Sequence, residues 1–222
     1  MIASELISDN LPSVKSTDSA WTVLGWMSEF KIYQLPIVDD RKFLGLVSED
    51  EILDSADLML PIGNIRYTSS KEGAYVFEYS HIYEVISTMN SLNLEVLPVL
   101  SPEKQYLGII TLRDVVDQLG TLFALEDPGS IIVLEVPQNS FVLSEIGRIA
   151  ESEHAKVMSF YVSPTRNGKN YKVTLKVNIE ETSRLVASFN RFNYNVIHTF
   201  TRRELPQNYQ RNLDALMNFL DI

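Results

Sequence analysis

The sequence predicts a mixed α/β protein in which two similar helix-strand-strand units are followed by a split βαββαβ domain. Two observations support this prediction. A Leu-Pro strand, a polar turn and a Gly-containing strand occur twice in the first half of the chain, and alternating strand and helix patterns fill residues 130–203. We therefore expect one unit at residues 1–60, a second at residues 61–126 and a third domain at residues 130–203.

The duplication extends over helix, strand and strand with one spacing. The pairs Leu35-Pro36 and Leu97-Pro98 lie 62 residues apart, and Gly45 and Gly108 lie 63 apart, so the second turn is one residue longer. A loop tolerates such a change in length. Upstream, the same offset of 62 relates two apolar helix faces, Ala20, Val23, Leu24 and Met27 to Ile82, Val85, Ile86 and Met89. Two units packed about a pseudo-two-fold axis explain this pattern.

Composition narrows the function classes. The 222 residues carry a net charge of −10, which argues against a nucleic-acid binder because such proteins present a basic face. No apolar run approaches the length of a membrane span, and neither cysteine nor a signal-peptide pattern is present, so we expect a cytoplasmic protein. The three histidines lack the spacing of metal ligands, and no nucleophile or acid-base set is visible. We therefore expect neither a metal site nor an enzyme.

The third domain follows a turn at Asp127-Pro128-Gly129. Strand, helix, strand, strand, helix and strand alternate in that order, with Asn167-Gly168 as the hairpin turn between the second and third strands. This order is the ferredoxin-like split pattern. Beyond it, residues 206–222 place Leu213, Leu216, Met217 and Leu220 on one helical face, which predicts a short amphipathic helix.

Several local expectations concern the helix ends and one tryptophan. Ser16-Thr17-Asp18 offers N-caps for the first helix, and Ser80 offers one for the helix of the second unit. The helix that closes the first unit is expected to continue to about Leu60, before Pro61. Trp26 lies off the apolar face of its helix and is expected to face a partner surface.

The duplicated unit resembles a known domain family. The unit of helix, Leu-Pro strand, turn and Gly-apolar-apolar-Ser/Thr-x-x-acid is similar to the cystathionine-β-synthase (CBS) domain, which occurs in tandem pairs. The resemblance covers roughly residues 1–122. Gly108 to Asp114 fits the motif completely, and Gly45 to Glu51 fits it with Glu51 in place of Asp. The resemblance implies that AMP, ADP, ATP or a related adenosine nucleotide binds in the cleft between the units.

The same motif residues have two interpretations. Thr111 and Asp114 form a capping box by sequence, whereas the CBS resemblance implies that Thr111 faces a phosphate and Asp114 accepts hydrogen bonds from ribose. Ser48 and Glu51 are the corresponding residues of the weaker first site, where Glu49 and Asp50 oppose a phosphate. The remaining candidates are Val96, Pro98, Pro36, Tyr75, Phe77 and Arg113. The apolar and aromatic residues among them would pack against the base or stack on it, and Arg113 would balance phosphate charge. Arg66, Lys71 and Lys104 are further cations that could balance phosphate charge.

The third domain, placed after a CBS pair, resembles an ACT domain, and this combination resembles the bacterial AcuB-type proteins linked to acetoin utilisation. ACT domains that bind amino acids usually have Gly in the turn after the first strand, where this chain has Pro137-Gln138-Asn139-Ser140. We therefore expect the ACT-like domain to serve mainly in dimer contact.

The combined expectation is a non-catalytic regulatory protein. The CBS pair senses an adenosine-type nucleotide, the protein forms a homodimer, and an unknown partner protein is regulated. The alternative is a structural or protein-interaction module without a small-molecule ligand. Glu51 favours this alternative, and the complete motif at Gly108–Asp114 opposes it.

Overall fold

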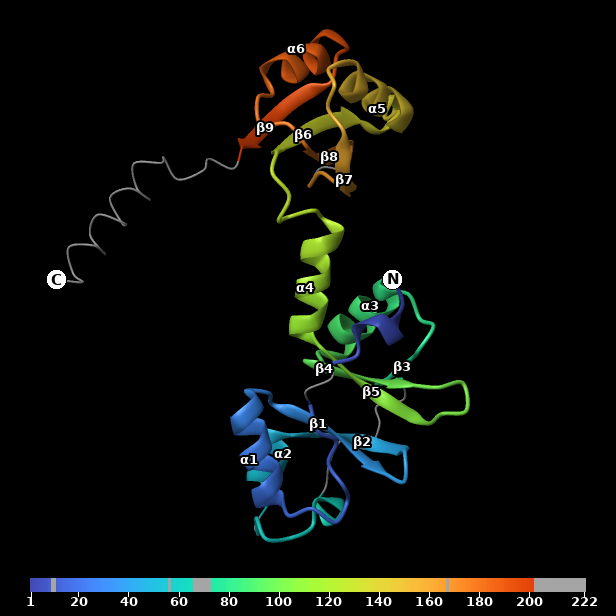
Figure 1. The fold of residues 1–222 in the computed structure, drawn as a ribbon, viewed down its shortest axis with the longest axis vertical. Helices are drawn as coiled ribbons and strands as arrows, with labels where there is room; N and C mark the ends of the chain where they lie inside the picture. The colour runs from blue at the N-terminus through green and yellow to red at the C-terminus, as the bar shows by residue number, and fades with distance from the viewer. Residues whose placement is uncertain (9–10, 56, 66–72, 167, 202–222) are drawn as a thin grey trace, which may run out of the picture. The chain divides into compact units, whose positions relative to one another are not determined.

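The computed structural model describes residues 1–8, 11–55, 57–65, 73–166 and 168–201. The chain divides into two compact units, Met1–Leu119 and Gly120–Ile222 (Figure 1). The amphipathic segment expected at residues 206–222 lies outside the described residues. Within the described ranges, no helix combines the length and apolar character needed to cross a membrane.

The first repeat of the N-terminal unit is built on one β-hairpin. Its elements are α1 (Ala20–Phe30), β1 (Gln34–Asp39), β2 (Lys42–Ser48) and α2 (Glu49–Leu53), preceded by the 3₁₀ helix η1 (Ala3–Leu6) and followed by η2 (Ile62–Asn64). The strands pair antiparallel from Gln34 opposite Ser48 to Asp39 opposite Lys42. The buried faces of α1 and both strands form one core, which includes Val23, Met27, Leu35, Ile37 and Val47.

The second repeat has the same order of helix, strand, strand and helix, with the short strand β3 added to its sheet. Its elements are β3 (Val76–Phe77), α3 (Ile82–Leu92), β4 (Val96–Leu100), β5 (Tyr106–Thr111) and α4 (Leu112–Leu122). A bulge interrupts the first hairpin between Ile37 and Val38, and another interrupts the second between Val99 and Leu100. The two bulges are 62 residues apart, so the duplication predicted from the sequence extends to backbone irregularities.

The first residues of the chain pack on the second repeat. The backbone N–H of Ala3 donates to the carbonyl of Ser80, and that of Ser8 donates to the carbonyl of Ile109, both at 2.8 Å. Ala3 and Leu6 are buried in the core of the second repeat. The lead segment therefore packs on the second repeat, although in the sequence it directly precedes the first.

Several local expectations are wrong. The helix α2 ends at Leu53, because the chain turns so that the carbonyls of Leu58 and Leu60 accept hydrogen bonds from the free N–H groups of Trp21 and Ala20 at the start of α1. The N-cap of α1 is Ser19, which accepts from the N–H of Thr22, rather than a residue of Ser16–Asp18.

Two more corrections concern α3 and the tryptophans. The N-cap of α3 is His81, because the carbonyl and N–H of Ser80 bond to Ala3 and Phe77 and Ser80 is buried. Trp26 is half-buried against the core of the first repeat, whereas Trp21 is 66% exposed. The apolar face of α1 is wide enough to include Trp26, so Trp21 is the tryptophan that faces outward.

The C-terminal unit has the ferredoxin-like fold that the sequence predicts. Its elements are β6 (Ser130–Pro137), η3 (Gln138–Ser140), α5 (Leu143–Ser152), β7 (Val157–Pro164), β8 (Asn170–Val177), α6 (Ser183–Arg191) and β9 (Asn195–Thr201). The antiparallel sheet has the order β7-β8-β6-β9. Helices α5 and α6 cover one face of it, and Ile149, Leu185 and Phe189 pack on the inward residues of β6 and β8 (Figure 1).

Candidate functional site

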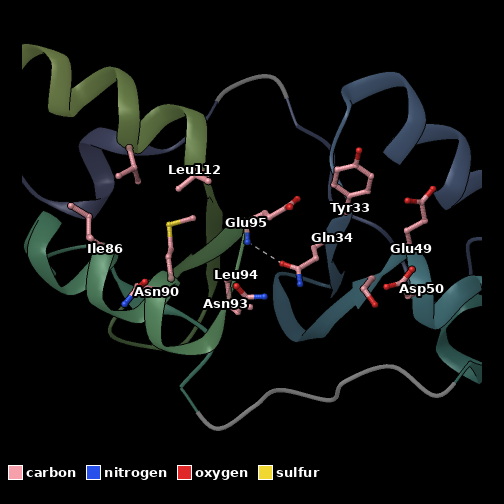
Figure 2. A pocket seen from close by; sticks show the side chains of 13 residues that line it. Tyr33, Gln34, Glu49, Asp50, Ile86, Asn90, Asn93, Leu94, Glu95 and Leu112 are labelled. Carbon is pink, nitrogen blue, oxygen red and sulfur yellow. Dashed lines mark hydrogen bonds between the residues drawn. The ribbon is translucent and has the colours of Figure 1, made fainter.

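A cleft with a volume of about 620 Å³ lies between the two repeats of the N-terminal unit. The first repeat contributes Tyr33 and Gln34 at the start of β1 and Ser48, Glu49 and Asp50 at the end of β2. The second repeat contributes Ile86, Met89 and Asn90 of α3, Asn93–Glu95 before β4, and Leu112 and Val115 of α4. Figure 2 shows the two groups of side chains facing each other across the cleft.

The repeat symmetry places these residues. Tyr33 and Glu95 occupy corresponding positions, three residues before Pro36 and Pro98. Glu49 and Leu112 correspond as the first residues of α2 and α4. Because antiparallel hairpins bring the start of one strand beside the end of the next, each repeat offers one such corner to the cleft.

A hydrogen bond joins the two sides of the cleft. The backbone N–H of Glu95 donates to the side-chain Oε1 of Gln34 at 3.2 Å (Figure 2). This bond fixes which end of the Gln34 amide faces Glu95. Its NH₂ group makes no hydrogen bond with any described residue, so it has two donors to offer to a ligand.

The cleft combines three kinds of chemistry. Leu94, Met89 and Val115 are buried apolar residues that form part of its wall. Side-chain amides come from Gln34, Asn90 and Asn93, and carboxylates come from Glu49, Asp50 and Glu95. None of the described residues that line it is a lysine or an arginine. Such a surface accommodates a flat apolar group with polar edges, together with hydroxyl groups that donate to carboxylates.

The two sequence motifs beside the cleft form matching capping boxes. Asp114 Oδ2 accepts hydrogen bonds from the N–H of Thr111 at 2.8 Å and from its hydroxyl at 2.6 Å, and the N–H of Asp114 donates back to Thr111 Oγ1 at 3.1 Å. Glu51 Oε2 accepts from the N–H and the hydroxyl of Ser48 at 2.8 and 2.9 Å, with the return bond at 3.3 Å. The longer Glu side chain therefore reproduces the same geometry.

Comparison with known proteins identifies the N-terminal unit. The family model for the CBS domain matches residues 3–57 and 67–120. These residues form a tandem pair of CBS domains. An inosine-5′-monophosphate dehydrogenase from Methanocaldococcus jannaschii is 25% identical over 114 residues, which are 51% of this chain and 22% of that protein. The chain thus spans about a fifth of the length of this curated relative.

Two solved structures are similar to part of this chain. Protein MJ1004 from Methanocaldococcus jannaschii is 23% identical, with a TM-score of 0.51 over 58% of this chain and 62% of that one. A CBS domain pair/ACT domain protein from Thermotoga maritima is 22% identical, with a TM-score of 0.48 over 54% of this chain and 96% of that one. At 23% identity, the likeness to protein MJ1004 concerns the fold alone.

The structure brings one of the predicted binding residues into the cleft of the CBS pair. Ser48 lines the cleft, and Thr111 and Asp114 flank it through their neighbours Leu112 and Val115. Glu51 forms the capping box with Ser48 and follows the lining residue Asp50 in α2. Arg113 is 89% exposed and its guanidinium lies 3.9 Å from the carboxylate of Asp117.

The other predicted residues lie in the strands and their packing. Pro36, Val96 and Pro98 are buried in β1 and β4. Tyr75 and Phe77 are half-buried and belong to a row of rings, with centroids 5.7 Å apart and their neighbours Phe43 and Tyr79 in contact at either end. Arg66 and Lys71 lie outside the described residues.

Sequence reasoning missed the polar residues that line the cleft most directly, namely Tyr33, Gln34, Asn90, Asn93 and Glu95. The offset of 62 residues relates Tyr33 to Glu95, so positions just before each Leu-Pro pair would have been a usable signal. The Gly-apolar-apolar-Ser/Thr-x-x-acid motif points instead to residues at the starts of α2 and α4. The side chains of those residues form hydrogen bonds with the backbone of their own helix turn.

A smaller cavity of about 450 Å³ lies at the hairpin turns of the CBS pair. Lys15, Arg41 and Asp40 line it together with the ring of Tyr106. Burial raises the pKa of the Tyr106 phenol and keeps it neutral. Within the described part of the chain, no group of three acidic or histidine side chains is arranged to hold a metal ion.

Proposed function

We propose that this protein is a non-catalytic regulator whose CBS pair binds an adenosine-type ligand in the cleft between its two repeats. The observation that carries the proposal is the cleft itself, which both repeats line with corresponding positions. Its volume falls in the range of small-molecule sites. The CBS resemblance points to the adenosine class.

The lining chemistry supports this choice of ligand. Adenine is flat and apolar on its faces, and the wall formed by Leu94, Met89 and Val115 suits it. Its ring edge carries donors and acceptors that match the free NH₂ of Gln34 and the amides of Asn90 and Asn93. The vicinal hydroxyls of ribose are donors, and Glu49, Asp50 and Glu95 provide acceptors.

The regulatory part of the proposal follows from the position of the ligand. A ligand that contacts both repeats binds best when they are held at one spacing, so it shifts the population of arrangements of the CBS pair. We propose that this shift is conveyed through a homodimer to a partner protein. We also propose that the C-terminal unit is an ACT-like domain of the AcuB type that serves dimer contact.

A thermal-shift and calorimetry screen tests the binding proposal. Adenosine derivatives should raise the unfolding midpoint of the full chain and give saturable heat, whereas guanosine derivatives and amino acids should not, because a ligand that binds only the folded state stabilises it. Gln34→Ala should weaken binding, with Gln118→Ala on α4 as a matched amide outside the cleft. Absence of any adenosine-type binding at millimolar concentration would contradict the proposal.

A second candidate function is a protein-interaction module without a small ligand. The observation that favours it is apolar exposure on the first repeat, where Trp21 is 66% and Met59 is 74% exposed. Such residues are typical of protein contact surfaces. This candidate predicts a silent ligand screen together with concentration-dependent association.

A further inference from the structure

The charged residues that line the cleft of the CBS pair, within the described part of the chain, are all acidic. Glu49, Asp50 and Glu95 line it, and none of the described residues that line it is basic. The three carboxylates come from both sides, Glu49 and Asp50 from the first repeat and Glu95 from the second (Figure 2). Both sides of the cleft therefore present negative charge to a ligand.

The groups that usually hold a phosphate are engaged elsewhere. The hydroxyls of Ser48 and Thr111 donate to the carboxylates of Glu51 and Asp114 within their own helix turns. Arg113 extends into solvent beside Asp117. A helix N-terminus attracts anions through its partial positive charge, but the first turn of α2 is entirely acidic, Glu49, Asp50 and Glu51, and this opposes the attraction.

We propose that the ligand of this cleft is an adenosine-type molecule whose 5′ substituent is neutral or cationic, and that phosphorylated adenosines are disfavoured. This inference rests on the proposed binding function and narrows its ligand class. Base and ribose use the apolar wall, the amides and part of the carboxylate set. The remaining negative charge selects against a phosphate and for an amine or another cation.

Three ligands that differ only at the 5′ position test the charge preference. They are 5′-amino-5′-deoxyadenosine, adenosine and AMP, which carry a cation, no charge and an anion at that position near neutral pH. Calorimetry on the full chain at low salt should give affinities in that order, with steps of about threefold for each unit of charge, as expected for charges about 6 Å apart in water. The differences should shrink at high salt because exposed charges are screened.

Charge-neutral variants then locate the effect. Glu95→Gln and, separately, Asp50→Asn should each reduce the affinity ratio of amine to adenosine by about threefold, because these two ligands differ by one unit of charge. Glu95 is the cleaner site because it precedes β4 and is not in the first turn of a helix. Glu151→Gln, an exposed acid on α5 in the C-terminal unit, removes the same charge and should leave the ratio unchanged.

The outcomes separate this inference from the function on which it rests. If none of the three ligands binds, the proposed function itself is wrong. If all three bind and AMP binds as tightly as adenosine or more tightly, adenosine binding stands and the charge inference is overturned. A ratio that responds equally to Glu151→Gln and Glu95→Gln would also overturn it, because the effect would then reflect net charge rather than the cleft.

Discussion

The hydroxyl of Thr111 donates a hydrogen bond of 2.6 Å to the carboxylate of Asp114, on the turn where β5 becomes α4. The same carboxylate oxygen accepts the backbone N–H of Thr111. Since α4 would otherwise begin with unsatisfied N–H groups, this pair stabilises the helix start. The motif that resembles a nucleotide-binding signature therefore has a structural role in this chain.

We expect Asp114→Ala to lower the free energy of unfolding by about 1 kcal/mol, the usual cost of losing a capping interaction. Affinity for adenosine should change by less than about twofold. The loss of the capping interaction destabilises the free and the ligand-bound folded protein equally, so it cancels in the binding free energy. Chemical denaturation and calorimetry measure the two quantities. Asp117→Ala, an exposed acid on the same helix, should change neither. A loss of affinity of tenfold or more with unchanged stability would instead assign Asp114 to the ribose.

A second prediction concerns Gly108, which lies in β5 under the lead segment. A Cβ at this position would overlap Ile7, so Gly108→Ala should displace the segment that carries Ala3 and Leu6 into the core. We expect a loss of about 1–3 kcal/mol in unfolding free energy, as for other overpacked sites.

The double variant Ile7→Ala with Gly108→Ala should recover part of this loss, because the smaller side chain leaves room for the new methyl group. Gly25→Ala is the matched control, since nothing lies within 4 Å of a Cβ at that helical position. It should increase stability by about 0.5–1 kcal/mol. If Gly108→Ala is also neutral or stabilising, the lead segment does not dock as described.

These examples show how far the sequence could predict the structure. The duplicated hairpins and the βαββαβ order follow from local periodicity, which persists because strands and helices bury one face each. The docking of Ala3 and Leu6 on the second repeat depends on contacts between segments about 80 residues apart, for which no local pattern exists. The end of α2 is hard to predict for a related reason, since distant N–H groups of α1 determine the path of the chain after Leu53.

The candidate site was less predictable than the fold. Helix starts with Ser or Thr and an acid are recognisable, but whether their side chains face a ligand or their own backbone depends on rotamers that sequence does not encode. Glu95 and Gln34 come from different repeats and meet only once the hairpins are paired. Their role therefore required the three-dimensional arrangement.

A third prediction concerns alkaline stability of the C-terminal unit. Burial, together with a hydrogen bond of 2.7 Å from the Tyr194 hydroxyl to Glu145, raises the pKa of Tyr194 to about 12. Because the folded pKa lies above the unfolded value of about 10, the stabilisation is complete below pH 10 and is lost as the pH rises towards 12.

Tyr194→Phe should flatten the decline in stability over that pH range and lower stability somewhat near neutral pH, where the hydrogen bond is intact. Denaturation curves at several alkaline pH values measure both effects. Tyr161→Phe, an exposed tyrosine on β7, is the control and should leave the alkaline slope unchanged. An unchanged slope for Tyr194→Phe would show that other groups dominate the alkaline transition.

The last prediction concerns association of the chain. Trp21 and Met59 are 66% and 74% exposed, and the backbone N–H of Trp21 donates to the carbonyl of Leu58, which places these side chains on neighbouring segments. An exposed apolar surface of this kind is typical of an interface. We expect a homodimer by light scattering at tens of micromolar, roughly the concentration at which a specific dimer persists.

The double variant Trp21→Ala with Met59→Ala should weaken dimerisation by at least tenfold, because large apolar residues often dominate an interface. Val116→Ala removes an exposed apolar side chain from α4, outside the C-terminal unit, and should leave the dimer intact. A wild-type monomer would contradict the dimer, and a dimer that persists in the double variant would show that another surface forms it.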